Sequence, residues 1–421
     1  MPARPASFPA ACGLRRLAGS FLLVWLVCVA RVSGQEWTPQ PITGLDGRFT
    51  LRGDATATIG TDDTGYFNYT DYDHTTLHLV RFDATAALRA GDHVTFLTEL
   101  RAEGDSLHGE WLGAVYAAFV RYRPWTARPI DLSAGLVPTA FGAYTARSYA
   151  TDNLLIGTPL AYQYLTAIRS DAIPANADQL AAMRGRGWLV EYPIGSHTLA
   201  TGLPLVSLSG YDTGLLVQAG GVRGRVQGLA SVTAGTLGSP GIDHNGSPQV
   251  AGRLVVRPAI GLVLGASAAS GHFLEQSVAD LLPPAQQHRR YPQRAWGADA
   301  EYSREYWLVR AEVVASDWRL PVIDQPVIDR PLGSIAWYAE GRYKIVPGLY
   351  AAARYDHMTF SDIQTSLGKT TWDAPVSRVE AGVGYSLTRW LLIKATIQHN
   401  TRDTARVPAL TLPSLQAVLW F

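Results

Sequence analysis

The chain has 421 residues, 36 Lys+Arg against 35 Asp+Glu and a formal net charge of +1. With only 17% charged residues it lacks the basic excess that grips a nucleic-acid backbone, so we expect no nucleic-acid partner. Hydrophobic residues reach 47%, and 40 Gly, 12 Trp and 19 Tyr accompany them. This composition excludes a disordered chain and indicates a folded protein rich in glycine and aromatic residues.

Residues 1–34 are typical of a secretory signal peptide, because arginines precede an apolar stretch at 21–30 and small residues end it at Gly34. Both cysteines, Cys12 and Cys28, lie inside this segment, so the mature chain can form no disulfide. Cleavage removes four arginines and leaves 32 basic and 35 acidic groups, a formal charge of −3. We predict a short periplasmic segment at 35–45 before the folded part begins.

Most of the mature chain alternates between apolar and polar residues with a period of two, which places alternate side chains on opposite faces of a strand. At 335–345, Ile335, Trp337 and Tyr343 share one face, whereas Glu340 and Arg342 share the other. We count eighteen such segments, at 46–60, 75–90, 93–103, 110–123, 129–141, 187–193, 199–208, 213–221, 224–235, 248–257, 260–270, 294–303, 306–318, 334–345, 349–359, 376–387, 390–399 and 411–421. The short segments 187–193 and 199–208 could instead belong to an inserted loop, which would lower the count by two.

Tight connections at 90–92, 346–348 and 388–389 are followed by long polar ones at 61–74, 142–186, 271–293, 319–332 and 361–374. Short turns on one side and long loops on the other are typical of an outer-membrane barrel. An open sheet in lipid would leave its edge amides unsatisfied, so a membrane-spanning reading requires closure. We therefore predict an all-β fold, a transmembrane antiparallel β-barrel of 16–18 strands over 46–421.

Apolar outward faces with Trp and Tyr near the strand ends favour this barrel over a soluble propeller, sandwich or solenoid. The chain ends in an alternating strand with a terminal aromatic, Phe421. This ending resembles the C-terminal strand that outer-membrane barrels present to their assembly machinery, so we assign Phe421 as an assembly signal. The expected location is the outer membrane of a Gram-negative bacterium.

The stretch Gly135-Leu-Val-Pro-Thr-Ala-Phe-Gly142, followed by Asp152-Asn-Leu-Leu-Ile-Gly-Thr-Pro-Leu-Ala-Tyr-Gln-Tyr-Leu165, resembles the phosphate-selective porin O/P family and related bacterial porins. The resemblance covers about 129–190 with any specificity. It implies a channel of sixteen to eighteen strands, commonly a homotrimer, in which a long loop folds into the lumen as a constriction. Phosphate selectivity does not carry over, because that family's lysine clusters are replaced here by three lysines in all.

In this sequence the inserted loop corresponds to 142–186, whose apolar residues, among them Leu154, Leu155, Tyr162 and Tyr164, require burial. We therefore expect it to fold into the lumen and pack against the barrel wall. Its polar residues would then line the constriction: Arg147, Asp152, Asn153, Arg169, Asp171, Arg184 and Arg186. Four cationic groups against two acidic ones suggest a weak anion preference, since a few local charges dominate a narrow passage.

Alternation also places charged residues on the inner wall of the barrel, and we assign as lumen-facing Arg310, Glu312, Glu340, Arg342, Arg354, Arg378 and Glu380. Two arrangements are open. The charges could pair with one another around a wet lumen, or they could separate into a basic and an acidic wall that orient passing solutes.

The sequence predicts an outer-membrane porin for passive diffusion of small polar or ionic solutes, including anions. The alternatives are an outer-membrane enzyme such as a hydrolase, and a structural or adhesive barrel that acts through its external loops. No Ser-His-Asp arrangement or metal-ligand spacing stands out, so we expect no catalytic residue, cofactor or metal. The expected partners are outer-membrane lipid and lipopolysaccharide, the barrel assembly machinery and small solutes.

Overall fold

The computed structural model describes residues 40–70, 74–105, 111–221, 224–240 and 246–421. The predicted signal peptide at 1–34 lies outside these residues. Within them, no helix is both long enough and apolar enough to cross a bilayer.

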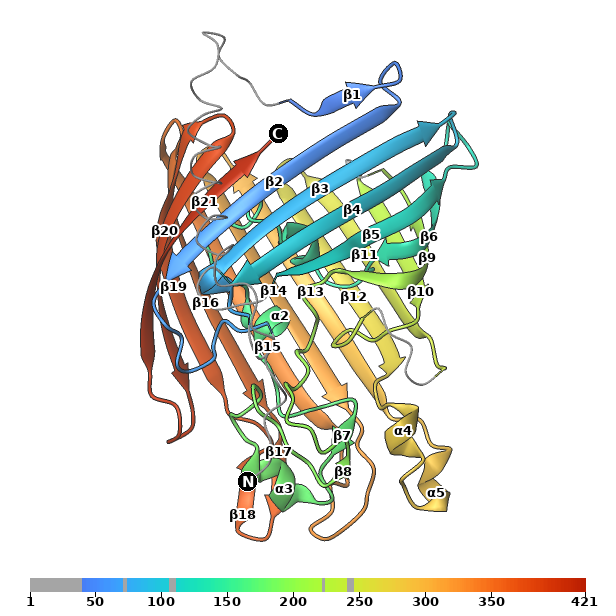
Figure 1. Cartoon of the computed structure of the whole chain (residues 1–421), viewed down its shortest axis with the longest axis vertical. Helices are drawn as coiled ribbons and strands as arrows, with labels where there is room; N and C mark the ends of the chain where they lie inside the picture. Colours follow the sequence, from blue (N-terminus) through green and yellow to red (C-terminus); the bar gives the residue numbers. More distant parts are fainter. Residues whose placement is uncertain (1–39, 71–73, 106–110, 222–223, 241–245) are drawn as a thin grey trace, which may run out of the picture. The chain divides into compact units, whose positions relative to one another are not determined.

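The main sheet is antiparallel and contains 17 strands, of which β1 (Ile42–Gly44) pairs with β2 alone. The other strands form one cyclic ladder, which closes where β2 pairs with β21 (Figure 1). In chain order this barrel consists of β2 (Phe49–Gly60), β3 (Leu79–Ala90), β4 (Val94–Asp105), β5 (Leu112–Tyr122), β6 (Ile130–Pro138), β9 (Tyr211–Ala219), β10 (Val226–Thr233), β11 (Gln249–Ala259), β12 (Leu262–His272), β13 (Pro292–Arg304), β14 (Trp307–Trp318), β15 (Leu332–Val346), β16 (Leu349–Phe360), β19 (Val376–Thr388), β20 (Leu391–Arg402) and β21 (Leu410–Trp420). The predicted transmembrane barrel is thus confirmed, with sixteen strands in the closed ladder.

Small elements occupy the connections. They are the strands β7 (Ala172–Ile173), β8 (Ile194–Gly195), β17 (Asp362–Thr365) and β18 (Gly368–Thr371), the α-helices α2 (Leu160–Gln163), α3 (Ala177–Ala182), α4 (Gln276–Ala279) and α5 (Pro284–Gln287), and the 3-10 helices η1 (Thr76–His78) and η2 (Thr145–Arg147).

The alternating pattern of each barrel strand separates an apolar outer face from a more polar inner face. On β15, Ile335 and Trp337 remain 48% and 39% exposed to the outside, whereas Tyr338 and Glu340 are 2% and 3% exposed. Outward apolar side chains next to inward polar ones suit a barrel whose outer surface meets lipid. The period of two in the sequence therefore determined which side chains enter the lumen.

The connections alternate as predicted. Turns such as 347–348 between β15 and β16 are short, whereas 61–78, 273–291, 319–331 and 361–375 are long. Positive φ angles at Gly91 and Gly348 allow two of the short turns, because glycine adopts this backbone region without a Cβ clash.

Two of the eighteen segments counted in the sequence, 187–193 and 199–208, are not barrel strands. β6 pairs directly with β9, so the whole of 139–210 is one connection, and the predicted loop at 142–186 is only its first part. Within it, an isolated bridge between Val190 and Ala200 and the two-residue pairing of β7 with β8 are the strand-like contacts. Their short apolar runs resemble strands in the sequence, but residues such as Val190, Tyr192, Leu205 and Val206 pack into the interior instead.

The C-terminus completes the barrel at Gly53. The Gly53 amide donates to the Phe421 carbonyl at 3.3 Å, and the Phe421 amide donates back to Gly53 at 2.9 Å. A Cβ on Gly53 would lie 2.5 Å from the Phe421 ring, so a larger residue at position 53 would displace the aromatic terminus. Next to this point, β1 continues along the edge of β2 by pairing Gly44 with Phe49.

Candidate functional site

The connection 139–210 fills part of the barrel interior, where Figure 1 shows α2 enclosed by the strands. We call it the inserted segment. Leu154 and Leu155 are 6% and 1% exposed and pack against Leu308 of β14 and Ala352 of β16, both on the inner face. These apolar residues of the segment are therefore buried against the wall, because water in the lumen would otherwise contact them.

Carboxylates of the wall accept hydrogen bonds from the backbone of the inserted segment. The Ala143 amide donates to Glu312 at 2.7 Å, and the Gly157 amide donates to Glu380 at 2.9 Å. The Tyr162 hydroxyl also donates to Glu312, at 2.7 Å. Burial holds the pKa of Tyr162 well above its usual range, so this hydroxyl keeps the proton that it donates.

Cations of the wall donate to backbone carbonyls of the same segment. Arg354 donates to Gly157 at 2.8 Å, and Arg378 donates to Thr158 at 2.8 Å. The Nζ atom of Lys394, a fully buried side chain, donates to the carbonyls of Ala150 at 2.6 Å, Asn153 at 2.7 Å and Leu155 at 3.2 Å. The segment is thus held through its main chain by charged groups on β14, β16, β19 and β20.

The inserted segment is held at a second place, near the end of the barrel that carries the long loops. The residue that holds it there is Asp373, between β18 and β19. Its carboxylate accepts from the amides of Ala167 at 2.8 Å and Gly185 at 2.7 Å, and from the Tyr164 hydroxyl at 3.3 Å. Burial raises the pKa of Asp373, while the amide hydrogen bonds act in the opposite direction.

The wall charges also pair with one another. Arg354 lies 2.9 Å from Asp356, 2.7 Å from Glu380 and 3.7 Å from Glu340, which in turn lies 3.4 Å from Arg310. This network favours the paired arrangement over two walls of opposite sign. Of the residues predicted to face the lumen, Arg342 stands apart, because its guanidinium lies 5.9 Å from the Tyr350 ring and does not hold the described part of the inserted segment as Arg354 and Arg378 do.

The structure disperses the residues predicted to line the constriction. Arg147 pairs with Glu301 at 2.8 Å, and Arg184 reaches Asp403 at 3.0 Å beside the outer loops. Asp152 is exposed, and the backbone rather than the side chain of this residue accepts from Arg310, at 3.4 Å.

Two more predicted residues hold the inserted segment itself together. Arg169 is 1% exposed, pairs with Asp171 at 2.7 Å and donates to the carbonyls of Val190 and Thr198 at 2.7 and 2.8 Å. Asn153 donates to the Gly157 carbonyl at 3.0 Å. Arg186 is half-buried. Most of these side chains are therefore already engaged by the fold.

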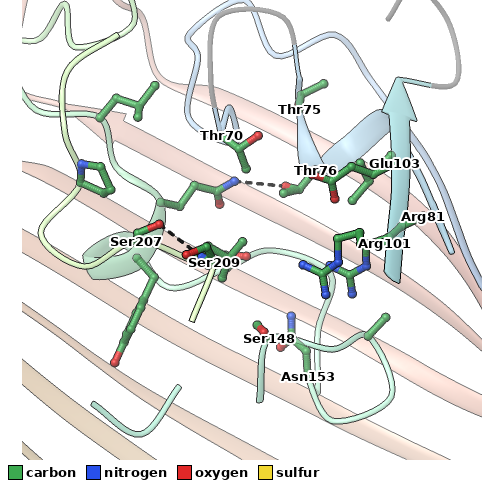
Figure 2. A pocket seen from close by; sticks show the side chains of 18 of the residues that line it. Thr70, Thr75, Thr76, Arg81, Arg101, Glu103, Ser148, Asn153, Ser207 and Ser209 are labelled. Carbon is green, nitrogen blue, oxygen red and sulfur yellow. Dashed lines mark hydrogen bonds between the residues drawn. The ribbon is translucent and has the colours of Figure 1, made fainter. Parts of the chain in front are cut away.

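A cavity of about 340 Å³ separates the inserted segment from the wall that β3 and β4 form. Figure 2 shows Arg81, Arg101 and Glu103 on the wall side, with Ser148 and Asn153 on the segment. The remaining lining is rich in hydroxyls: Thr56, Thr70, Thr75, Thr76, Thr158, Thr201, Ser207 and Ser209. Of the predicted constriction residues, Asn153 lines this cavity.

Asp83 binds both arginines of the cavity through their Nε atoms, at 3.0 Å for Arg81 and 2.5 Å for Arg101. The Arg101 guanidinium also stacks on Tyr116, with its central carbon 3.3 Å from the ring centroid. In the strand register Arg81 lies directly opposite Glu103. A rigid patch of two guanidiniums beside one carboxylate therefore faces the cavity.

The sequence analysis did not select Arg81, Arg101 or Glu103 as site residues. It also gave no role to Lys394 or Asp373. The alternation of residue types shows which face of a strand carries a residue. It does not show which residues lie opposite it across the lumen.

No family model matches the chain, and no curated protein matches it. Solved structures do resemble it. The outer membrane channel DcaP of Acinetobacter baumannii is 12% identical with a TM-score of 0.54, over 91% of this chain and 100% of that one. The anion-selective porin from Comamonas acidovorans is 10% identical with a TM-score of 0.53, over 89% and 99%. An outer membrane protein of Vibrio cholerae, OmpT lacking loop L8, is 11% identical with a TM-score of 0.52, over 89% and 99%. At these identities the likeness shows a shared barrel fold.

Proposed function

We propose that the protein is a passive diffusion channel for small polar or ionic solutes in the outer membrane of a Gram-negative bacterium. The observation that carries this proposal is the polar cavity beside a segment that the opposite wall holds by its main chain. An inserted segment fixed to one wall narrows a barrel and leaves a passage along the other wall. The names of the similar structures, which include a channel and a porin, add support at the level of the fold.

The charge selectivity of the channel depends on which charged residues line the passage. The weak anion preference was predicted from arginines of 142–186, yet Arg147 and Arg169 are engaged by Glu301 and Asp171. We therefore propose that any selectivity comes from the patch of Arg81, Arg101 and Glu103 instead. The reversal potential of the purified channel under a salt gradient measures this selectivity directly.

Deleting 148–172 tests the constriction. Conductance in a planar bilayer should rise, because the deletion removes the part of the inserted segment that packs on β14 and β16. Deleting 284–287, a short helix with no buried residue, is the matched control and should leave conductance unchanged. Unchanged conductance of an assembled 148–172 deletion would show that the inserted segment does not limit the passage.

The alternatives predict other results. An outer-membrane enzyme would show turnover that a single substitution abolishes, and an adhesive barrel would bind a partner through its loops without conducting ions. Homotrimer formation, contact with lipopolysaccharide and recognition of Phe421 by the assembly machinery remain proposals. Mass measurement of the detergent-solubilised protein tests the first of these.

A further inference from the structure

The cavity beside β3 and β4 contains buried polar atoms that the described residues leave without a hydrogen-bond partner. They include Oγ1 of Thr56, Oε1 of Gln163 and Oε1 of Gln416, on side chains that are 4%, 2% and 6% exposed. Nη2 of Arg101 is another, and it lies 3.6 Å from Oε1 of Glu99. These atoms lie beneath the cavity surface, whereas the lining itself is rich in hydroxyl, amide and charged side chains, so it is suited to a polar solute.

Asp83 occupies the Nε side of both arginines, and Nη2 of Arg101 lies 3.6 Å from Glu99, so a ligand would meet the remaining terminal nitrogens. Figure 2 shows the two guanidinium groups next to each other at the cavity edge. Adjacent planar guanidinium groups match the two oxygens of a carboxylate. A carboxylate group of a solute is therefore the natural ligand at this position.

The surrounding charges disfavour a solute that is only anionic. Asp83 lies opposite Asp54 in the register, and Glu99 and Glu103 follow on β4. Carboxyl groups therefore outnumber the two guanidiniums in this part of the wall, so the local charge does not favour a solute that is only anionic. A solute that carries both charges and no net charge is not disfavoured in this way.

Glu103 supplies the complementary group. It lies opposite Arg81 in the register and lines the same cavity. Some solutes carry a cationic group close to a carboxylate. When the carboxylate of such a solute contacts the arginines, its cationic group would contact Glu103. The lining hydroxyls can solvate the rest of a small polar molecule.

Resting on the proposed channel function, we propose that this cavity is a selectivity site for small zwitterions of the α-amino-acid class. The carboxylate of the solute binds the terminal N–H groups of Arg81 and Arg101, and its ammonium group binds Glu103. The inserted segment contributes neutral groups, Ser148 and Asn153, that close the other side of the passage.

Swelling of proteoliposomes that contain the full mature protein tests this proposal with three small solutes: serine as the zwitterion, glycerate as the anion and erythritol as the neutral polyol. Serine should enter faster than either of the others. Glu103→Gln should lower the serine rate relative to erythritol by roughly fivefold, since local charges multiply the entry rate of a matching solute. Asp362→Asn, which removes a carboxylate from the β17–β18 hairpin, is the matched control and should change neither rate.

Arg101→Lys provides a second variant that keeps the positive charge beside Asp83 and loses the planar fork. It should also reduce the serine rate relative to the erythritol rate measured in the same variant. Retained heat-modifiable mobility in gels verifies that each variant is folded. Equal rates for serine and erythritol, fastest entry of glycerate, or an unaltered serine advantage in Glu103→Gln would each overturn the proposal. Absence of both swelling and ion conductance would instead refute the channel function on which it rests.

Discussion

Replacing Lys394 with methionine should detach the turn at 150–155 from the barrel wall. Three carbonyls of this turn, from Ala150, Asn153 and Leu155, accept from the buried Nζ atom at 2.6, 2.7 and 3.2 Å. Methionine has a similar length but donates no hydrogen bond, so the carbonyls lose their partner in a buried place. Glu380 and Arg354 would still hold Gly157.

The size of the effect follows from the number of bonds. A hydrogen bond to a charged group contributes about 1.5–3 kcal/mol, but the desolvation of the buried ammonium group offsets part of the total. We therefore expect the three bonds together to stabilise the attached turn by about 3 kcal/mol. Since 1.4 kcal/mol corresponds to a factor of ten, opening of the turn should become about a hundredfold more frequent.

Cysteine labelling measures this opening, because the two cysteines of the chain, Cys12 and Cys28, both lie in the predicted signal peptide. Leu154→Cys places a thiol at a position that is 6% exposed, so a polar maleimide reacts with it only when the turn opens. The labelling rate should rise about a hundredfold when Lys394→Met is added. Lys369→Met is the control, because the Lys369 side chain is 70% exposed and pairs with Asp362 away from the turn. An equal labelling rate with and without Lys394→Met would refute the reasoning.

Removing Phe421 should lower the amount of protein in the outer membrane, because its backbone and ring complete the barrel at Gly53; quantitative blotting of membrane fractions checks this. Gly157→Val should raise conductance, since a Cβ there would lie 2.6 Å from Oε2 of Glu380 and push the inserted segment off the wall; bilayer recording measures it. Arg169→Glu should increase proteolysis within 139–210 rather than shift ion selectivity, because it would face Asp171 with a like charge; limited trypsin digestion and reversal potentials decide between these.

For each of these three variants, the opposite result would contradict the structural explanation given for it. Normal membrane levels without Phe421 would remove the role of this residue in barrel closure. Wild-type conductance in a folded Gly157→Val variant would separate the segment contact from the width of the passage. A shift of Arg169→Glu toward cation selectivity without increased proteolysis would return Arg169 to the constriction.

The barrel could be predicted from the sequence because the pattern that specifies each strand lies within that strand. In β15, the alternation of Ile335 and Trp337 with Tyr338 and Glu340 sets the lipid and lumen faces without reference to any other strand. Short turns and long loops are local as well. The error in the strand count has the same origin, since the short apolar runs at 187–193 and 199–208 resemble strands but pack into the interior, and a local pattern does not distinguish these two environments.

The arrangement across the lumen was decided by tertiary structure alone. Arg81, Arg101, Arg354 and Glu380 all face the interior, yet Arg81 and Arg101 line a cavity, whereas Arg354 and Glu380 bind the backbone of the inserted segment. Arg169, predicted at the constriction, instead donates hydrogen bonds to carbonyls within the inserted segment. Which wall holds a segment depends on contacts between residues up to two hundred or more positions apart, as between Gly157 and Glu380 at a separation of 223. Such contacts form only when the barrel closes, because closure brings distant strands around one interior.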